Sequence, residues 1–204
     1  MATTTPNYGW DVPTSSDYVK LGAVAIETLG DDIDATVYAA LNGKSSGKVL
    51  LNATTLTSAT TVTIDNVFSA TYRNYLILMS TNTTGTGTLN SLQLRVGGVT
   101  TGGTGYNSSN FYADLTTSGV INPSSASSSW ALRNAGPIGT SITMFNPFQT
   151  TPTLVTGTFI TPASALNSHG FFGGQHTGNT SFDGIQINCT TATGIVRIYG
   201  IKDV

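Results

Sequence analysis

Charged residues are scarce in this sequence. Asp, Glu, Lys and Arg make up only 9% of its 204 residues, where about a quarter is usual for soluble proteins. Eight Lys and Arg residues are too few to neutralise a run of phosphates, which excludes nucleic acid as a partner. The net charge of -2, with 39% apolar residues, is also unlike the composition of disordered chains.

Long apolar runs and a secretion signal are also missing. No stretch approaches the ~20 apolar residues of a membrane-spanning helix, so no membrane insertion is expected. Residues 1–6 lack both a basic start and an apolar segment, and we therefore expect the chain to fold in the cytoplasm in which it is made. The single cysteine, Cys189, cannot form an internal disulfide, and its alternating neighbours predict a buried thiol in a strand.

Groups that transfer protons or bind metals are few. The two histidines, His169 and His176, lie in one glycine-rich stretch, and no cysteine or aspartate stands at a metal-ligand spacing from them. No Glu follows Glu27, and Asp114 is the only later Asp in a strand-like run. A Ser-His-Asp hydrolase remains formally possible, but it would depend on a histidine in a loop without a motif. We expect a protein that is not an enzyme and that has no cofactor, no metal and no catalytic residues.

One segment matches parts of two catalytic sequence motifs but lacks the structural context that they require. Residues 43–47 fit the G-x-S-x-G pattern around Ser45, but that motif requires a strand before it and a helix after it. Here a predicted helix comes first and a predicted strand follows. The Gly-Lys-Ser of the same segment lacks the earlier glycine of a phosphate-binding loop, because Tyr38 stands in its place.

The uneven distribution of charge divides the chain. Residues 1–49 hold 9 of the 18 charged residues, and the composition changes in a Gly/Ser segment. We predict an extended arm over residues 1–17, a helical segment over 18–42, a linker over 43–48 and a β domain over 49–204.

The helical segment has one apolar stripe, which Asp17 can cap at its start. Four of its residues are spaced by seven, which indicates helices that meet along a seam. We assign oligomerisation to five residues of the stripe, namely Val19, Ile26, Leu29, Ile33 and Val37. Gly30 leaves a second interpretation open, a hairpin of two short helices packed on its own domain.

From residue 49 onward the apolar pattern has a period of two, broken by Gly, Asn, Pro and Ser clusters. Short strands at this spacing predict an antiparallel β-sandwich, jelly-roll-like. The serine-rich run 124–129 and the glycine-rich run 97–105 are interpreted as loops. The predicted strands are Val49–Leu56, Thr60–Ile64, Tyr75–Ser80, Ser91–Val96, Phe111–Leu115, Trp130–Arg133, Ser141–Phe145, Leu154–Ile160, Gly184–Asn188 and Gly194–Ile201.

Six aromatic residues lie in or near polar loops, where flat apolar rings beside hydrogen-bonding groups are typical of sugar-binding sites. They are Tyr106, Phe111, Tyr112, Trp130, Phe171 and Phe172. Each of them also fits a place in the core. We select Tyr106, Tyr112 and Trp130 as the candidate ligand-binding residues.

Several segments resemble structural proteins of tailed bacteriophages. Residues 7–13 (NYGWDVP) and 16–34 (SDYVKLGAVAIETLGDDID) look like the N-terminal segment of such proteins. Residues 67–78 (VFSATYRNYLIL) resemble an early strand of the β-sandwich in tail-fibre and head-fibre proteins. Residues 182–187 (FDGIQI) and 193–202 (TGIVRIYGIK) are similar to its closing strands. The resemblance covers about a third of the chain.

The resemblance implies a virion protein without enzymatic activity, which is often trimeric. Its N-terminal arm would dock on other virion proteins, and we expect Tyr8, Trp10 and Pro13 to be the apolar anchors. Two functions follow from it. The chain is either an accessory fibre whose β domain binds a host surface polysaccharide, or a capsid decoration or head-fibre protein with a structural role. An exposed aromatic cluster would favour the first.

Overall fold

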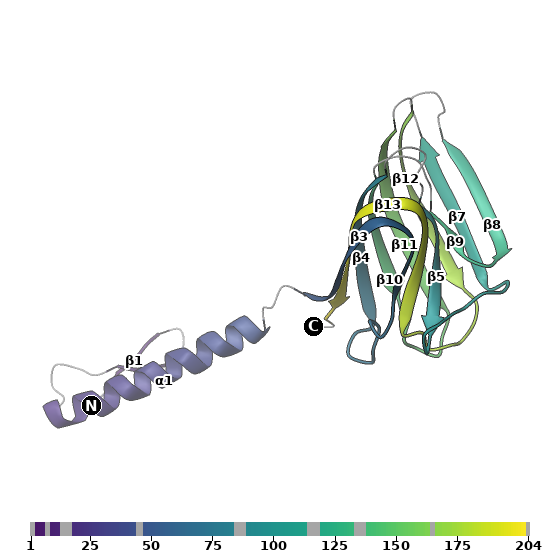
Figure 1. The fold of residues 1–204 in the computed structure, drawn as a ribbon. Coiled ribbons are helices and arrows are strands. Elements are labelled where there is room, and N and C mark those ends of the chain that lie inside the picture. Colours follow the sequence, from purple (N-terminus) through teal and green to yellow (C-terminus); the bar gives the residue numbers. More distant parts are fainter. Residues whose placement is uncertain are drawn as a thin grey trace. The chain divides into compact units, whose positions relative to one another are not determined.

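The computed structural model describes residues 3–6, 9–12, 18–43, 47–83, 89–113, 119–132, 138–163 and 166–202. The chain divides into two compact units, Met1–Ser46 and Gly47–Val204 (Figure 1). The division falls inside the predicted linker.

The N-terminal unit combines one helix with a small β-ribbon. Strands β1 (Thr3–Thr4) and β2 (Asp11–Val12) pair antiparallel. The described residues of the expected arm therefore form a two-stranded ribbon and are not a single extended segment. Helix α1 (Val19–Gly43) runs through Gly30 without a break, which corrects the alternative of two short helices. No described helix is long and apolar enough to cross a membrane.

The second unit is a single antiparallel sheet that curls into a half-barrel (Figure 1). This confirms the mainly β class with a helix at the N-terminus. The order along the sheet is β6-β5-β13-β4-β10-β11-β12-β7-β8, while β3 pairs with β13 and β9 pairs with β5. The strands are β3 (Lys48–Ile64), β4 (Asn74–Thr83), β5 (Leu89–Val96), β6 (Val99–Thr100), β7 (Tyr106–Ala113), β8 (Val120–Ser127), β9 (Trp130–Ala131), β10 (Ile138–Phe145), β11 (Thr153–Ala163), β12 (Leu166–His176) and β13 (Gly184–Ile201).

Strand β13 turns the corner of the half-barrel. Its first part pairs with β5 and its second part with β4, while β3 follows it along the other side. The ladder is irregular between Asn188 and Gly194, where Thr191 has a φ of 51° and Ser58 on β3 has a φ of 48°. Bulges of this kind bend strands and let one sheet fold back on itself.

The core lies inside the half-barrel and follows the period of two. Along β11, Val155, Gly157 and Phe159 face inward, while Leu154 and Ile160 face outward. The largest fully buried side chains come from many strands and loops; they include Trp130, Tyr75, Tyr106, Phe172, Phe182, Ile77, Leu92 and Leu94. Cys189 is also buried, as predicted.

Three details of the strand prediction are wrong. The two strands predicted over 49–56 and 60–64 are one continuous strand, β3, because bulged pairing carries the ladder past Ser58. The serine-rich run 124–129 is largely part of β8, and the glycine-rich stretch ending at His176 is β12. Both were interpreted as loops because they are rich in Ser or Gly, which are typical of turns.

Candidate binding groove

The three aromatic residues selected as ligand-binding are in the core. Tyr106 and Trp130 are fully buried and Tyr112 is 9% exposed, so the prediction that these rings stack on a ligand is wrong. The rings of Tyr106 and Trp130 meet edge to face with centroids 5.0 Å apart. The indole N–H of Trp130 donates to the Gln175 carbonyl (3.3 Å), which ties β9 to β12. These rings therefore hold the half-barrel together.

The predicted docking residues are only partly described. Tyr8 and Pro13 lie outside the described residues. Trp10 is half-buried, and its indole N–H donates to the Thr36 hydroxyl of α1 (3.2 Å). Its main-chain N–H donates to the Thr5 hydroxyl (3.0 Å). In this unit Trp10 thus packs the ribbon on the helix.

Most side chains of the predicted oligomerisation stripe are exposed on α1. Ile26 is 64% exposed, Val37 47% and Ile33 38%, while Leu29 is half-buried. The side chain of Val19 lies outside the described residues. Within the described part of this unit, the stripe therefore presents branched apolar side chains that the ribbon does not cover.

An aromatic pair lies on the outer face of the sheet. Phe111 on β7 and Phe171 on β12 are directly opposite in the ladder, and their rings stack with centroids 5.0 Å apart and planes at 23°. Phe171 is 56% exposed and Phe111 is half-buried. Ile121 stands opposite Phe111 on β8 and is also exposed. The period of two places all three on one face, where they form a flat apolar platform.

Two shallow hollows that share Gly173 lie along β12 beside this platform, and together they are called the groove. Its apolar part has a volume of about 330 Å³ and is lined by the platform residues, with Ser109, Thr156, Phe172 and Gly173. Gly173 also lines the adjoining polar part, of about 360 Å³. A Cβ built on Gly173 would meet only the Val155 carbonyl oxygen, at 3.8 Å, so the missing side chain leaves the floor of the groove open.

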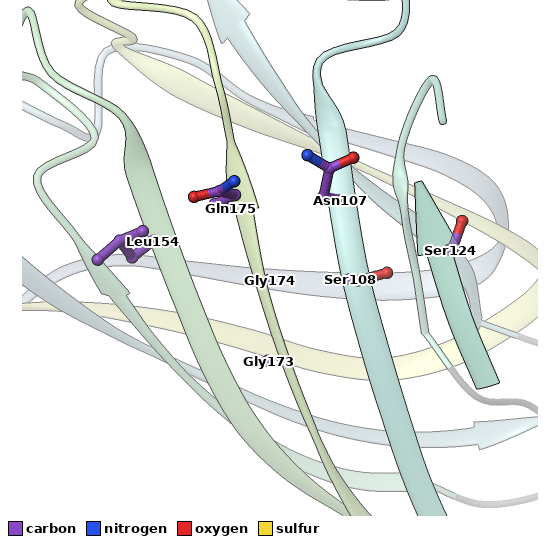
Figure 2. A pocket seen from close by; sticks show the side chains of 7 residues that line it. All are labelled: Asn107, Ser108, Ser124, Leu154, Gly173, Gly174 and Gln175. Atoms are coloured by element: carbon purple, nitrogen blue, oxygen red, sulfur yellow. The ribbon is translucent and has the colours of Figure 1, made fainter. Parts of the chain in front are cut away.

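The polar part is shown in Figure 2, with Asn107 and Gln175 opposite each other on β7 and β12. The Asn107 side-chain oxygen accepts the N–H of Ala126 (2.9 Å), and this bond fixes the orientation of the amide. The amide nitrogens of Asn107 and Gln175 point toward each other (Figure 2). Leu154 and Ser124 line opposite sides.

Charge is almost absent from this part of the molecule. Between residues 96 and 182 the sequence has only two charged residues, Asp114 and Arg133, and both lie outside the described residues. The five strands β10, β11, β12, β7 and β8 contain no Asp, Glu, Lys or Arg. The groove thus offers apolar rings, amides and hydroxyls.

Several titratable groups of the described β domain have structural partners. Burial lowers the pKa of His176, whose ring packs edge to face on Tyr106 (4.6 Å) and Phe182 (5.0 Å). Burial raises the pKa of Tyr106 to about 12. Asp65 pairs with Arg95, and Asp183 accepts the N–H of Gly97 (2.8 Å). Asp114 lies outside the described residues.

Most of the groove was not identified from the sequence. Phe111 and Phe171 were among the six candidate aromatics, but Asn107, Gly173 and Gln175 were not. The available signal was the alternation of Phe171, Gly173 and Gln175, which puts the three on one face once residues 166–176 are read as a strand. Comparison with protein-family models, with curated proteins and with solved structures finds no match for this chain.

Proposed function

We propose that this chain is a structural protein of a tailed-bacteriophage virion, an accessory fibre whose β domain binds a glycan of the host surface through the groove on β12. The stacked pair of Phe111 and Phe171 carries the binding part of this proposal. A ring that is 56% exposed on a sheet face, beside an open groove, has no role in the core. The phage assignment is supported by the resemblance of residues 7–34 and of the closing strands.

The composition of the groove favours a sugar. The C–H faces of a pyranose ring pack on aromatic side chains, and its hydroxyls pair with amides and hydroxyls. The groove presents both kinds of group side by side, with Phe171 at one part and Asn107 at the other. The groups sit on neighbouring strands of one sheet, which gives the preorganisation that favours binding.

The N-terminal unit has two proposed roles. Residues 1–17 attach the chain to other virion proteins, and the stripe of Ile26, Ile33 and Val37 joins α1 to two further copies in a homotrimer. The exposure of these branched side chains supports the second role, since an exposed apolar stripe at heptad spacing is stabilised by burial against like helices. Sedimentation of the full chain at micromolar concentration should give a trimer, and Ile33→Asp should give a monomer. A monomer for the unsubstituted chain would refute this part.

Glycan binding is tested with purified protein on an array of bacterial surface polysaccharides. We expect at least one polysaccharide to bind, and Phe171→Ala to weaken that binding tenfold or more, as loss of a central aromatic anchor does. The control is Val99→Ala on β6, which truncates a side chain of similar exposure (67%) away from the groove. Thermal melts of both variants establish that the fold is kept.

The competing function is capsid decoration. If no polysaccharide binds, or if Phe171→Ala binds as well as the unsubstituted chain, the groove is not a glycan site. Particles that lack the protein would then be expected to adsorb normally to cells but to break at a lower temperature. Immunogold labelling of intact particles tests the virion assignment itself, and absence of label would refute it.

A further inference from the structure

We propose that the groove selects an uncharged saccharide, and that Asn107 orients it by donating to an oxygen of the sugar. This inference rests on the proposed glycan binding and specifies its ligand class. Host surface polysaccharides are commonly either neutral or rich in carboxylates and phosphates. The groove can favour only one of these classes.

The absence of charge carries the first half of the argument. A carboxylate or phosphate that leaves water for a partly apolar surface needs a cation as its partner. The strands that form the groove contain no Lys or Arg, and the side chains that line it are amides, hydroxyls, Leu154 and the platform residues. His169 is the one titratable side chain on the outer face of β12, and it lies beyond Phe171, away from Asn107. An anionic sugar therefore loses hydration in the groove without gaining an ion pair from the described residues that line it.

The platform adds a preference for apolar sugar faces. The rings of Phe111 and Phe171 stack at 23°, so together with Ile121 they present a broad flat surface. Such a surface matches the side of a hexose that carries axial C–H groups. Substituents that put charge on that side would be held against phenyl rings, which cannot hydrate them.

The fixed orientation of Asn107 supports the second part of the proposal, the hydrogen bond to a sugar oxygen. Because its oxygen already accepts from Ala126, its side-chain nitrogen is a donor whose direction is set by the fold. That nitrogen faces the space above β12 toward Gln175 (Figure 2). A ligand in the groove must then offer an acceptor at this point, and hydroxyl, ring and acetamido oxygens all qualify. Asn107 is thus a specificity-determining contact beside the open floor at Gly173.

The ligand class is tested on the same array with neutral and acidic polysaccharides, at 50 and 500 mM sodium chloride. We expect the polysaccharides that bind through Phe171 to be neutral, with affinities that change less than twofold between the two salt concentrations. If the Phe171-dependent binders are acidic and lose tenfold or more in high salt, the neutral class is wrong while glycan binding stands. If no binding depends on Phe171, the proposed function fails and this inference fails with it.

The role of Asn107 is tested by Asn107→Asp on a polysaccharide that binds. Aspartate keeps an oxygen that accepts from Ala126, but it replaces the donor by a second acceptor with negative charge. We expect a tenfold or greater loss of affinity, which corresponds to about 1.4 kcal/mol. Asn52→Asp is the matched control, since the Asn52 oxygen also accepts a local hydrogen bond (2.7 Å from Thr54) on β3, outside the groove. Equal affinities for the two variants would overturn the role of Asn107.

A second variant fills the groove without touching its polar groups. Gly173→Val adds a side chain into open space at an ordinary strand position, so the melting temperature should be kept or slightly raised. Binding should fall tenfold or more, because the side chain stands between the platform and Asn107. Unchanged binding by a folded Gly173→Val protein would place the ligand elsewhere.

Discussion

The hydroxyl oxygen of Tyr106 accepts the main-chain N–H of Leu94 (2.9 Å). The same hydroxyl donates to the Thr101 carbonyl (2.9 Å), so one buried side chain satisfies two main-chain groups near β5 from the start of β7. Burial raises the pKa of this phenol to about 12, so the hydroxyl is protonated at neutral pH and can donate this bond.

Tyr106→Phe is expected to destabilise the β domain. The ring would still fill its place beside Trp130 and His176, but the N–H of Leu94 and the Thr101 carbonyl would be left unpaired. Such a loss costs about 1–3 kcal/mol. Urea unfolding followed by tryptophan fluorescence measures it. Tyr38→Phe, at a 70% exposed position on α1, should change the unfolding free energy of the β domain by less than about 0.5 kcal/mol.

The prediction that Tyr106 contacts a ligand was wrong because its burial depends on residues distant in the sequence. Gly105 and Asn107 flank it and are typical of an exposed loop, so a solvent-facing ring was a fair expectation. Its burial depends on Trp130 and His176, which are distant in the sequence and meet it only when the sheet curls. The local sequence pattern predicts the strands in which large side chains alternate. It does not predict that the sheet curls and brings these three rings together.

Two glycines in strands are expected to respond in opposite ways to alanine. Gly194 on β13 has a φ of 149°, and an added Cβ would overlap the Ser80 carbonyl oxygen and lie 2.7 Å from Thr81 Cα. Gly194→Ala should lower the unfolding free energy by about 2 kcal/mol or more, because both the backbone and the neighbouring strand must shift. Gly173→Ala should be neutral or stabilising by about 0.4–1 kcal/mol. Similar urea midpoints for the two variants would contradict the geometry.

Stability should fall at acid pH because of His176. Burial lowers the pKa of this side chain in the folded state, so the unfolded chain binds its proton first as the pH drops through 6.5. Its contribution is therefore fully present above the unfolded pKa and is lost as the pH falls below it. The unfolding free energy, measured between pH 8 and pH 5, should decline in the unsubstituted chain. His176→Gln should flatten that decline, whereas His169→Gln, at an exposed position, should keep it.

The fold should protect Cys189 from alkylation. The thiol donates to the Ala59 carbonyl (3.2 Å), and burial raises its pKa, so little thiolate forms or meets solvent. Iodoacetamide at pH 8 should modify the native chain at least a hundredfold more slowly than the chain in 6 M guanidinium. Mass spectrometry of the two time courses measures the ratio. Equal rates would mean that the strand pairing around Cys189 opens readily.

The strands of the groove were the hardest part of the fold to predict. Residues 166–176 alternate, but Gly170 and Gly174 occupy inward positions where large side chains are expected. A Cβ on Gly170 would overlap the Phe111 carbonyl oxygen, and one on Gly174 would meet the Asn107 carbonyl oxygen at 2.5 Å. Neighbouring strands approach closely at these two positions, and only glycine leaves room for that approach. Because the requirement comes from tertiary structure, the composition of the segment alone predicts a loop.

One of the few charged pairs of the β domain belongs to the fold and not to a ligand site. Arg95 is 8% exposed and forms a two-pronged contact with Asp65 (2.6 and 3.2 Å), and it also donates to the Gly98 carbonyl. Asp65, which directly follows β3, is thus the partner of a buried cation. Arg95→Met should lower the unfolding free energy by about 2–4 kcal/mol, because these acceptors lose a donor that water reaches poorly.

The matched control for Arg95→Met is Arg73→Met. The Arg73 guanidinium donates to the Asn146 amide oxygen (3.1 Å) at an exposed position, where water replaces the lost bond. We expect a change within about 0.5 kcal/mol in urea unfolding. Equal losses for the two variants would mean that burial does not strengthen the pair of Arg95 and Asp65. A large difference would show that burial strengthens the pair of Arg95 and Asp65, so that Arg95 contributes to the stability of the fold.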